Sequence, residues 1–316
     1  MISTFRRMKL LYEMYNLFNY DKLKYLAPLY RKYGIQKKYF SSLSSSAFPN
    51  DALVDHPWLD KEDSLTALAG HPNFLTLNDN VKSALINWST DGYAILKSFF
   101  SEETVTLINQ LLIELMKDKR MPVKDERKLM YAVRYSEEMR NLVNIKELTD
   151  IMDLLMGRPV ELFQSVNFLQ GSEDPAHSDF IHMSTYPYGY LMAVWIALED
   201  IDMENGPLFY YPGSHKLPYI MNSHYDHGGN RWLLGKTNKK KYAEAIDKVI
   251  EEHQFEKKTF TASKGDVLIW HANLLHGGSK VIDPARTRKS MVMHYFGSDV
   301  IKYHEITQRP SLKPGK

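Results

Sequence analysis

The chain has 316 residues, of which 44% are hydrophobic and 25% are charged. This balance is typical of a folded globular protein and excludes a disordered or collagen-like chain. The sequence contains no cysteine, which excludes disulfide frameworks, cysteine-ligated zinc, iron–sulfur clusters and thiol nucleophiles. Any metal site must therefore use histidine, aspartate, glutamate or water.

The first 40 residues are strongly basic and rich in aromatic side chains. They carry nine Lys and Arg against two acidic residues, a net charge of +7; the whole chain is +2, so the remainder is −5. Phe5, Met8, Tyr12 and Tyr15 recur at helical spacing. We expect a helical extension that packs on the body of the protein and leaves its basic side in solvent. Contact with a membrane surface or a polyanion is the alternative.

No segment has the pattern of a signal peptide or a membrane span. The first 18 residues interrupt their apolar run with charged side chains. The longest stretch without Asp, Glu, Lys or Arg, residues 180–198, contains His182, Pro187 and Gly189 and would span a membrane poorly. The cytoplasm is the expected compartment.

The first half of the chain reads as helical. The Ser-rich run 41–46 predicts an irregular connection, and we place a boundary near residue 80, between an N-terminal extension (1–80) and a main domain (81–316). A helix leading to Trp88, a strand over 92–100 and a helix capped by Ser101 follow. Another helix should begin near Glu147 and end at Gly157.

After Gly157 the hydrophobic pattern changes to that of short strands. They are expected over 160–169, 191–198, 208–211, 259–262, 267–271 and 290–296. Many short strands at close intervals favour a double-sheet roll or barrel over alternating βαβ units. Residues 224–253 interrupt the series and read as an insertion with a helix from Tyr242.

Histidines and a carboxylate beside these strands are the candidate site. His177 and Asp179 are separated by one residue, and His276 lies 97 residues after Asp179. Two imidazoles and one carboxylate are the ligand set of non-haem Fe(II) enzymes, and a strand would place His177 and Asp179 on one side. A bare His-x-Asp motif is weak evidence, and a surface turn capped by Asp179 is the alternative. A second copy, His224-Tyr225-Asp226, lies among Gly and Asn residues and is expected to be a loop.

The wider context resembles the phytanoyl-CoA dioxygenase family of Fe(II)/2-oxoglutarate-dependent oxygenases. The resemblance runs from about Trp88 to Phe296. Its motifs are W…DGYAILKSFFSEE, AHSDF, VWIALEDIDMENGPLFYYPGSHK, KGDVLIWHANLLHGGS and TRKSMVMHYF. It implies a mainly β fold with flanking helices: a double-stranded β-helix core (jelly-roll, cupin-like) with a helical N-terminal extension.

Carried onto this sequence, the resemblance implies a role for five residues. His177, Asp179 and His276 would be the iron ligands, and Arg288 would bind the distal carboxylate of 2-oxoglutarate. A guanidinium suits this task because it pairs with a carboxylate bidentately. Trp195 resembles a wall of the cosubstrate pocket, with a plain core aromatic as the alternative.

Other candidates compete with this assignment. Arg286 is the local competitor of Arg288. We expect structural roles for His271 and His215 and a possible substrate contact for His182. The segments 119–135 and 224–253 are the expected covers of the site.

The resemblance implies the cofactors Fe(II), 2-oxoglutarate and O2, and a hydroxylation that releases succinate and CO2. Asp179 is retained where halogenating relatives carry a small residue, which favours hydroxylation, whereas Ser178 replaces a frequent Gln. A small-molecule or lipid-like substrate is expected, because the acidic body offers no broad basic surface to a nucleic acid. The alternative is a catalytically silent protein that binds metal and 2-oxoglutarate as a sensor or binding module.

Overall fold

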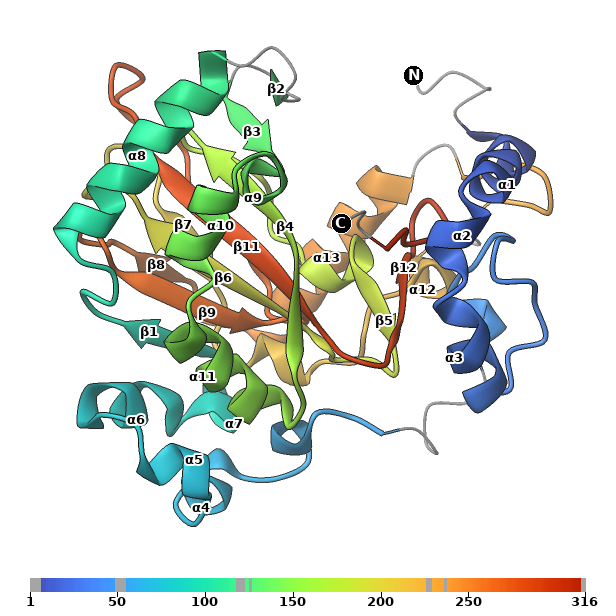
Figure 1. Ribbon diagram of the computed structural model, residues 1–316, viewed down its shortest axis with the longest axis horizontal. Coiled ribbons are helices and arrows are strands. Elements are labelled where there is room, and N and C mark those ends of the chain that lie inside the picture. Colours follow the sequence, from blue (N-terminus) through green and yellow to red (C-terminus); the bar gives the residue numbers. More distant parts are fainter. Residues whose placement is uncertain are drawn as a thin grey trace.

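The computed structural model describes residues 7–48, 55–117, 123–124, 127–225, 229–235 and 238–313. Its strands form three antiparallel sheets (Figure 1). The largest has the order β1-β9-β6-β11-β4-β3-β2; the others are β10-β7-β8 and β13-β12-β5. The strands are β1 (Tyr93–Leu96), β2 (Val123–Lys124), β3 (Lys128–Met130), β4 (Val160–Phe168), β5 (Ser184–Tyr186), β6 (Leu191–Ala197), β7 (Leu208–Tyr210), β8 (Lys258–Phe260), β9 (Val267–His271), β10 (His276–Gly278), β11 (Ser290–Gly297), β12 (Ile301–His304) and β13 (Arg309–Pro310).

The helices precede the strand-rich part or lie beside it. They are α1 (Lys9–Phe18), α2 (Tyr20–Leu23), α3 (Leu26–Lys32), α4 (Ser64–Ala67), α5 (Pro72–Leu75), α6 (Asp79–Leu85), α7 (Trp88–Asp91), α8 (Glu102–Lys117), α9 (Ala132–Tyr135), α10 (Glu137–Val143), α11 (Lys146–Met156), α12 (Asn222–Tyr225) and α13 (Asn238–His253). No helix of the described residues is long and apolar enough to cross a membrane.

The large sheet is buried on both faces. On β6, Met192 and Val194 pack with α8 and α11 in one apolar cluster, whereas Ala193 and Trp195 pack with the small sheet β7-β8 in another. Successive side chains of a strand point to opposite faces, so a strand covered on both sides reads as a continuous apolar run. This is why 191–198 and 267–271 carried a strong strand signal. The facing sheets and flanking helices confirm the expected mainly β jelly-roll class.

Local signals set the helix ends. The Ser101 hydroxyl accepts the Thr104 N–H at 3.1 Å at the start of α8, satisfying a donor that the helix leaves unpaired. Gly157 ends α11 with a φ of +70°, a conformation that glycine adopts without steric cost. Both boundaries confirm the sequence prediction.

Several predicted boundaries need correction. The strand expected over 92–100 ends at Leu96, because Ser98 turns the chain with a positive φ. The strand expected over 259–262 is β8, one residue earlier and shorter. The strands β5, β10, β12 and β13 were not predicted; they are short and include polar or glycine residues. The segment 119–135 is described only in part, and its described end pairs β3 with β4.

The N-terminal helices reach the core beside the site. Leu23 and Leu26 pack with Phe180, Tyr186 and Phe296 in a buried apolar cluster. Figure 1 shows α1, α2 and α3 together beside β12 and β5, away from the large sheet. The domain boundary near residue 80 stays a prediction.

Candidate metal centre and cosubstrate cavity

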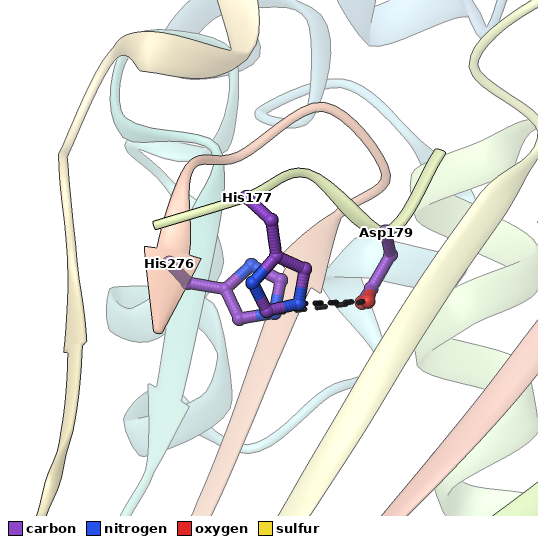
Figure 2. Close-up of side chains that lie close together, drawn as sticks. All are labelled: His177, Asp179 and His276. Atoms are coloured by element: carbon purple, nitrogen blue, oxygen red, sulfur yellow. Dashed lines mark ion pairs between the residues drawn. The ribbon is translucent and has the colours of Figure 1, made fainter. Parts of the chain in front are cut away.

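Three side chains from two distant parts of the sequence meet between the sheets. His177 and Asp179 lie on one irregular segment, and His276 begins β10; all three point toward one another (Figure 2). One ligand atom of each lies within 4.8 Å of the others. Asp179 Oδ1 is 3.9 Å from His177 Nε2 and 3.7 Å from His276 Nε2.

The backbone holds the two imidazoles side by side. His177 and His276 form an isolated antiparallel bridge, each donating its N–H to the other's carbonyl at 2.9 and 3.0 Å. The strand expected through Asp179 does not form. Asp179 instead opens a 3-10 turn, Asp179–Ile181, and this turn brings its carboxylate toward the histidines.

The histidine tautomers follow from their partners. His177 Nδ1 lies 2.9 Å from the Pro175 carbonyl, and His276 Nδ1 lies 3.0 Å from the Leu274 carbonyl. A carbonyl only accepts, so each Nδ1 carries the proton and each Nε2 presents a lone pair toward Asp179. Burial lowers the pKa of His276 to about 4, so this imidazole is neutral at pH 7. Three such donors suit a divalent metal such as Fe(II).

Neighbouring side chains fix the carboxylate. Trp270 donates its indole N–H to Asp179 Oδ2 at 2.9 Å, and His294 Nε2 lies 3.5 Å from the same oxygen. Burial alone would raise the pKa of Asp179, but the surrounding imidazoles, His276 first, hold it well below its usual range. The carboxylate is therefore ionised, and its Oδ1 remains directed at the two candidate ligands.

A cavity extends from this cluster along the inner face of the large sheet. It encloses about 480 Å³, counting space open to solvent. Besides the three candidate ligands, it is lined by Val166, Phe168, Ser172, Asp174, Trp195, Leu208, Trp270, Gly277, Arg288, Val292 and His294. Half of these fourteen lining residues are apolar or glycine, and the other half comprises the three candidate ligands together with Ser172, Asp174, Arg288 and His294.

Arg288 is a buried cation without a salt bridge among the described residues, and Asp174 and Glu199 are the acidic side chains whose charges partly offset the effect of its burial. Its side chain is 2% exposed, and its Nη1 donates to the Ser290 hydroxyl at 2.7 Å. Arg288 Nε and the nearby Trp195 Nε1 are buried with no hydrogen-bond partner among the described residues. Burial lowers the pKa of Arg288 to about 10, so it stays charged at pH 7. A buried guanidinium of this kind is suited to bind an anionic group.

Arg286 occupies a different environment. It is partly exposed and pairs with Asp202 Oδ2 at 2.9 Å and Glu204 Oε2 at 3.1 Å. Its guanidinium is therefore engaged on the surface, and among these two arginines only Arg288 lines the cavity.

The four other histidines considered in the sequence analysis do not line this cavity. His271 is buried with Nε2 3.4 Å from Asp60 Oδ1, outside the cavity lining. His215 packs against His271, and Asn273 donates to its carbonyl. His182 lies between His177 and His304 and does not line the cavity. His224 belongs to α12 and accepts the Met221 N–H, and Asp226 falls outside the described residues.

Sequence reasoning missed two members of the site, His294 and Trp270. Both lay inside motifs quoted for the resemblance, MVMHYF and GDVLIWH. Their alternation would have served as a signal. His294 shares its strand face with Val292, and Trp270 shares its face with Leu268, the face turned to the inner sheet.

Comparison with known proteins identifies the family and the fold. The family model described as phytanoyl-CoA dioxygenase (PhyH) matches residues 88–289. The chain belongs to the phytanoyl-CoA dioxygenase family. Among curated relatives, ectoine dioxygenase of Sphingopyxis alaskensis is 26% identical over 215 residues, covering 61% of this chain and 69% of that protein. Peroxisomal phytanoyl-CoA dioxygenase of Rattus norvegicus is 29% identical over 133 residues, covering 40% of this chain and 35% of that protein.

Solved structures share the fold. The non-haem alpha-ketoglutarate-dependent carbocyclase SnoK from nogalamycin biosynthesis superposes with a TM-score of 0.62 at 18% identity, covering 77% of this chain and 95% of that one. EctD from S. alaskensis with 2-oxoglutarate and 5-hydroxyectoine gives a TM-score of 0.56 at 19% identity, covering 76% and 86%. The fold is thus that of the family's oxygenases.

Proposed function

We propose that this member of the phytanoyl-CoA dioxygenase family is an Fe(II)/2-oxoglutarate-dependent dioxygenase that hydroxylates a small-molecule or lipid-like substrate. The family match and the His-Asp-His cluster favour an enzyme over a silent binding module. The observation that carries the proposal is that Arg288 and Trp195 line the cavity that contains this cluster, with Arg288 Nε and Trp195 Nε1 buried and without a hydrogen-bond partner among the described residues.

His177, Asp179 and His276 are the proposed iron ligands, because one ligand atom of each lies within 4.8 Å of the others. A backbone carbonyl bonds Nδ1 of each histidine, and Trp270 bonds Oδ2 of the aspartate. Bound iron supplies the activation of O2 that oxidises the substrate and converts 2-oxoglutarate to succinate and CO2. The retained carboxylate of Asp179 favours hydroxylation over halogenation.

Arg288 is proposed to bind the distal carboxylate of 2-oxoglutarate, with Trp195 donating from the cavity wall. A guanidinium fork fixes the position and the orientation of a carboxylate together. Val166, Leu208 and Val292 contribute apolar walls to the same cavity, and electrostatic interactions are stronger in such a low-dielectric environment.

The proposed substrate class is argued from the net charge of the chain and from the name of a related protein. Outside the first 40 residues the net charge is −5, which disfavours a nucleic acid. One related protein is named ectoine dioxygenase, after a small molecule. A small or lipid-like molecule fits both observations.

The test is a spectrum followed by an assay. Under anaerobic conditions, Fe(II) with 2-oxoglutarate should give the weak visible charge-transfer band of a chelate at the site. The band should disappear in His177→Ala and persist in His224→Ala, which alters the second His-x-Asp copy on α12.

Succinate release is then measured against a panel of small metabolites and lipids. Stimulation by one compound, with a hydroxylated product found by mass spectrometry, supports the proposal. A folded protein without the band, or a band that survives His177→Ala, contradicts the assignment.

A further inference from the structure

The helix α1 presents its apolar side to solvent and its polar side to the protein. Six large apolar side chains of this ten-residue helix are between 41 and 86% exposed: Leu10, Leu11, Met14, Tyr15, Leu17 and Phe18. At 100° per residue they occupy a continuous arc of about 160°. This orientation is the reverse of the expected packed extension, in which solvent would meet the basic side.

Specific contacts fix the helix in this orientation. Asn16 is buried and donates to the Phe40 carbonyl at 2.8 Å, and Glu13 accepts the Ser42 N–H at 3.0 Å. Tyr12, on the same side, packs beneath the Arg309 guanidinium, 4.7 Å from the ring centroid. The polar side of α1 is thus used internally, and rotation of the helix would break these contacts.

The segment at 229–235 extends the exposed apolar surface. Lys9 donates its N–H to the Trp232 carbonyl at 2.9 Å, and Met8 bridges Leu233. The Trp232 side chain is 63% exposed and packs with the Arg231 guanidinium 5.1 Å from its ring. Together, Trp232 and the six side chains of α1 form one surface, here called the α1 patch.

The N-terminal segment that carries most of the α1 patch is cationic. Within residues 7–40 there are eight Lys and Arg against Glu13 and Asp21. Apolar and aromatic side chains at the centre with Lys and Arg around them are the composition of helices that lie in a membrane interface. Tryptophan is enriched at the same depth. Two copies of this chain joined through the patch would bring two basic surfaces together, whereas an anionic lipid surface would neutralise them.

We propose that the α1 patch docks the protein onto anionic phospholipid bilayers. The helix lies in the plane of the interface and inserts Leu10, Leu17 and Phe18 among the lipids, while the surrounding Lys and Arg contact the headgroups. A helix of ten residues is about 15 Å long, half of what a membrane crossing needs. The contact is therefore peripheral and reversible.

The test uses the full chain and sucrose-loaded vesicles. Sedimentation should show binding to vesicles of equal parts phosphatidylserine and phosphatidylcholine, weaker binding to phosphatidylcholine alone, and release as salt is raised. Phe18→Glu should weaken binding roughly ten-fold or more, because it removes the most exposed apolar group and adds a negative charge. Ile282→Glu is the matched control, an apolar residue that is 67% exposed and far from α1 in the sequence; it should bind as the wild type does.

Trp232 gives a second measurement. Trp88, Trp195 and Trp270 are fully buried, and the half-buried Trp58 donates its indole N–H to the Leu154 carbonyl. A blue shift of the fluorescence on adding vesicles should therefore come from Trp232 and be lost in Trp232→Phe. Equal vesicle binding by wild type and Phe18→Glu would overturn the proposal, as would no binding to either vesicle. A concentration-dependent dimer that Phe18→Glu dissolves, without vesicle binding, would assign the patch to a second copy instead.

Discussion

At the metal centre, the two oxygens of Asp179 have separate tasks. Oδ2 accepts the Trp270 indole N–H at 2.9 Å, while Oδ1 faces His177 and His276. The indole thereby sets the angle at which the carboxylate is presented. Partners of this kind fix the orientation of metal ligands and affect their affinity.

Trp270→Phe is therefore expected to weaken Fe(II) binding about 10- to 100-fold while leaving the fold intact, because the ring is kept. Competition with a fluorescent chelator measures the dissociation constant. The control is Trp58→Phe, which removes an indole bond to the Leu154 carbonyl outside the cavity lining. Equal affinities in the two variants would show that the indole does not position Asp179.

Arg288 and Arg286 provide a matched pair. Arg288→Lys should raise the KM for 2-oxoglutarate about 10- to 100-fold, because a single ammonium replaces the charged, bidentate fork. Arg286→Lys should leave that KM unchanged, since its guanidinium binds Asp202 and Glu204 on the surface. Steady-state succinate release at varied 2-oxoglutarate checks both, and the reverse result would exchange their roles.

Single residues were predicted as far as local sequence carries information. The motif context selected His177, Asp179, His276 and Arg288, which the structure brings to one cavity. It missed His294, because alternation places this residue on the face of Val292 but indicates a site only once that face is known to turn toward the cavity. The face of a strand is a property of the sheet it joins.

At the scale of elements, α13 supports the segments that carry the candidate ligands. Tyr242 and Ile246 pack with Ala176, Ile181 and Leu275, which flank these ligands in sequence. The Tyr242 hydroxyl accepts the N–H of Ser178, the residue between His177 and Asp179, at 3.0 Å. The segment 224–253 was expected to be a cover of the site. Its helix α13 packs an apolar side against residues that flank the candidate ligands, and the role as a cover stays a prediction.

Tyr242→Phe should weaken Fe(II) binding several-fold to about 100-fold, because a buried N–H beside two ligands loses its acceptor. Tyr225→Phe is the control: this ring packs on Tyr242, but its hydroxyl bonds Asn222 Oδ1 at 2.8 Å. The charge-transfer band with 2-oxoglutarate should shift in Tyr242→Phe only. Indistinguishable bands and affinities would mean that α13 packs beside the centre without positioning it.

Elements with a strong periodic pattern were predicted well, and those fixed by tertiary contacts were not. The strand 267–271 matches β9, whose two faces are both covered. The strand expected through Asp179 is a turn, since the bridge between His177 and His276 ends the pairing there. In α1 the spacing correctly indicated a helix, but Tyr15 faces solvent, because hydrogen bonds by Asn16 and Glu13 outweigh the apolar side.

At the scale of the whole molecule, several buried histidines make stability depend on pH. Burial lowers the pKa of His215 and His182 to about 3 and that of His304 to about 4, against about 6.5 in an unfolded chain. Between these values the unfolded chain binds more protons than the folded protein. Their stabilising effect is thus complete above pH 6.5 and is lost as the pH falls toward 4.

The metal-free protein should accordingly lose up to about 1.4 kcal/mol of unfolding free energy per pH unit for each such imidazole below pH 6.5. Urea unfolding at pH 7 and pH 5 measures the loss. His304→Gln should reduce it, whereas His253→Gln, at the exposed end of α13, should not. Identical pH dependence in all three proteins would contradict the assignment.

The fold class was predictable because strands buried on both faces repeat at short intervals after Gly157. How the first 80 residues meet that core was not, since α2 and α3 are held by packing against Phe180 and Phe296, residues more than 100 positions away. Contacts between residues so far apart in the sequence produce no periodic hydrophobic pattern in either segment.

The pairing of His177 with His276 has a consequence for how the centre is assembled. The backbone N–H and carbonyl groups of the two residues bond each other. The pairing that forms beside the small sheet therefore also brings the two imidazoles together. Removal of iron with a chelator should leave these segments paired, so that the site can bind iron again without refolding. Loss of activity through iron depletion would then be quickly reversible. Disruption of that backbone pairing would instead disturb the local fold and the proposed metal site together.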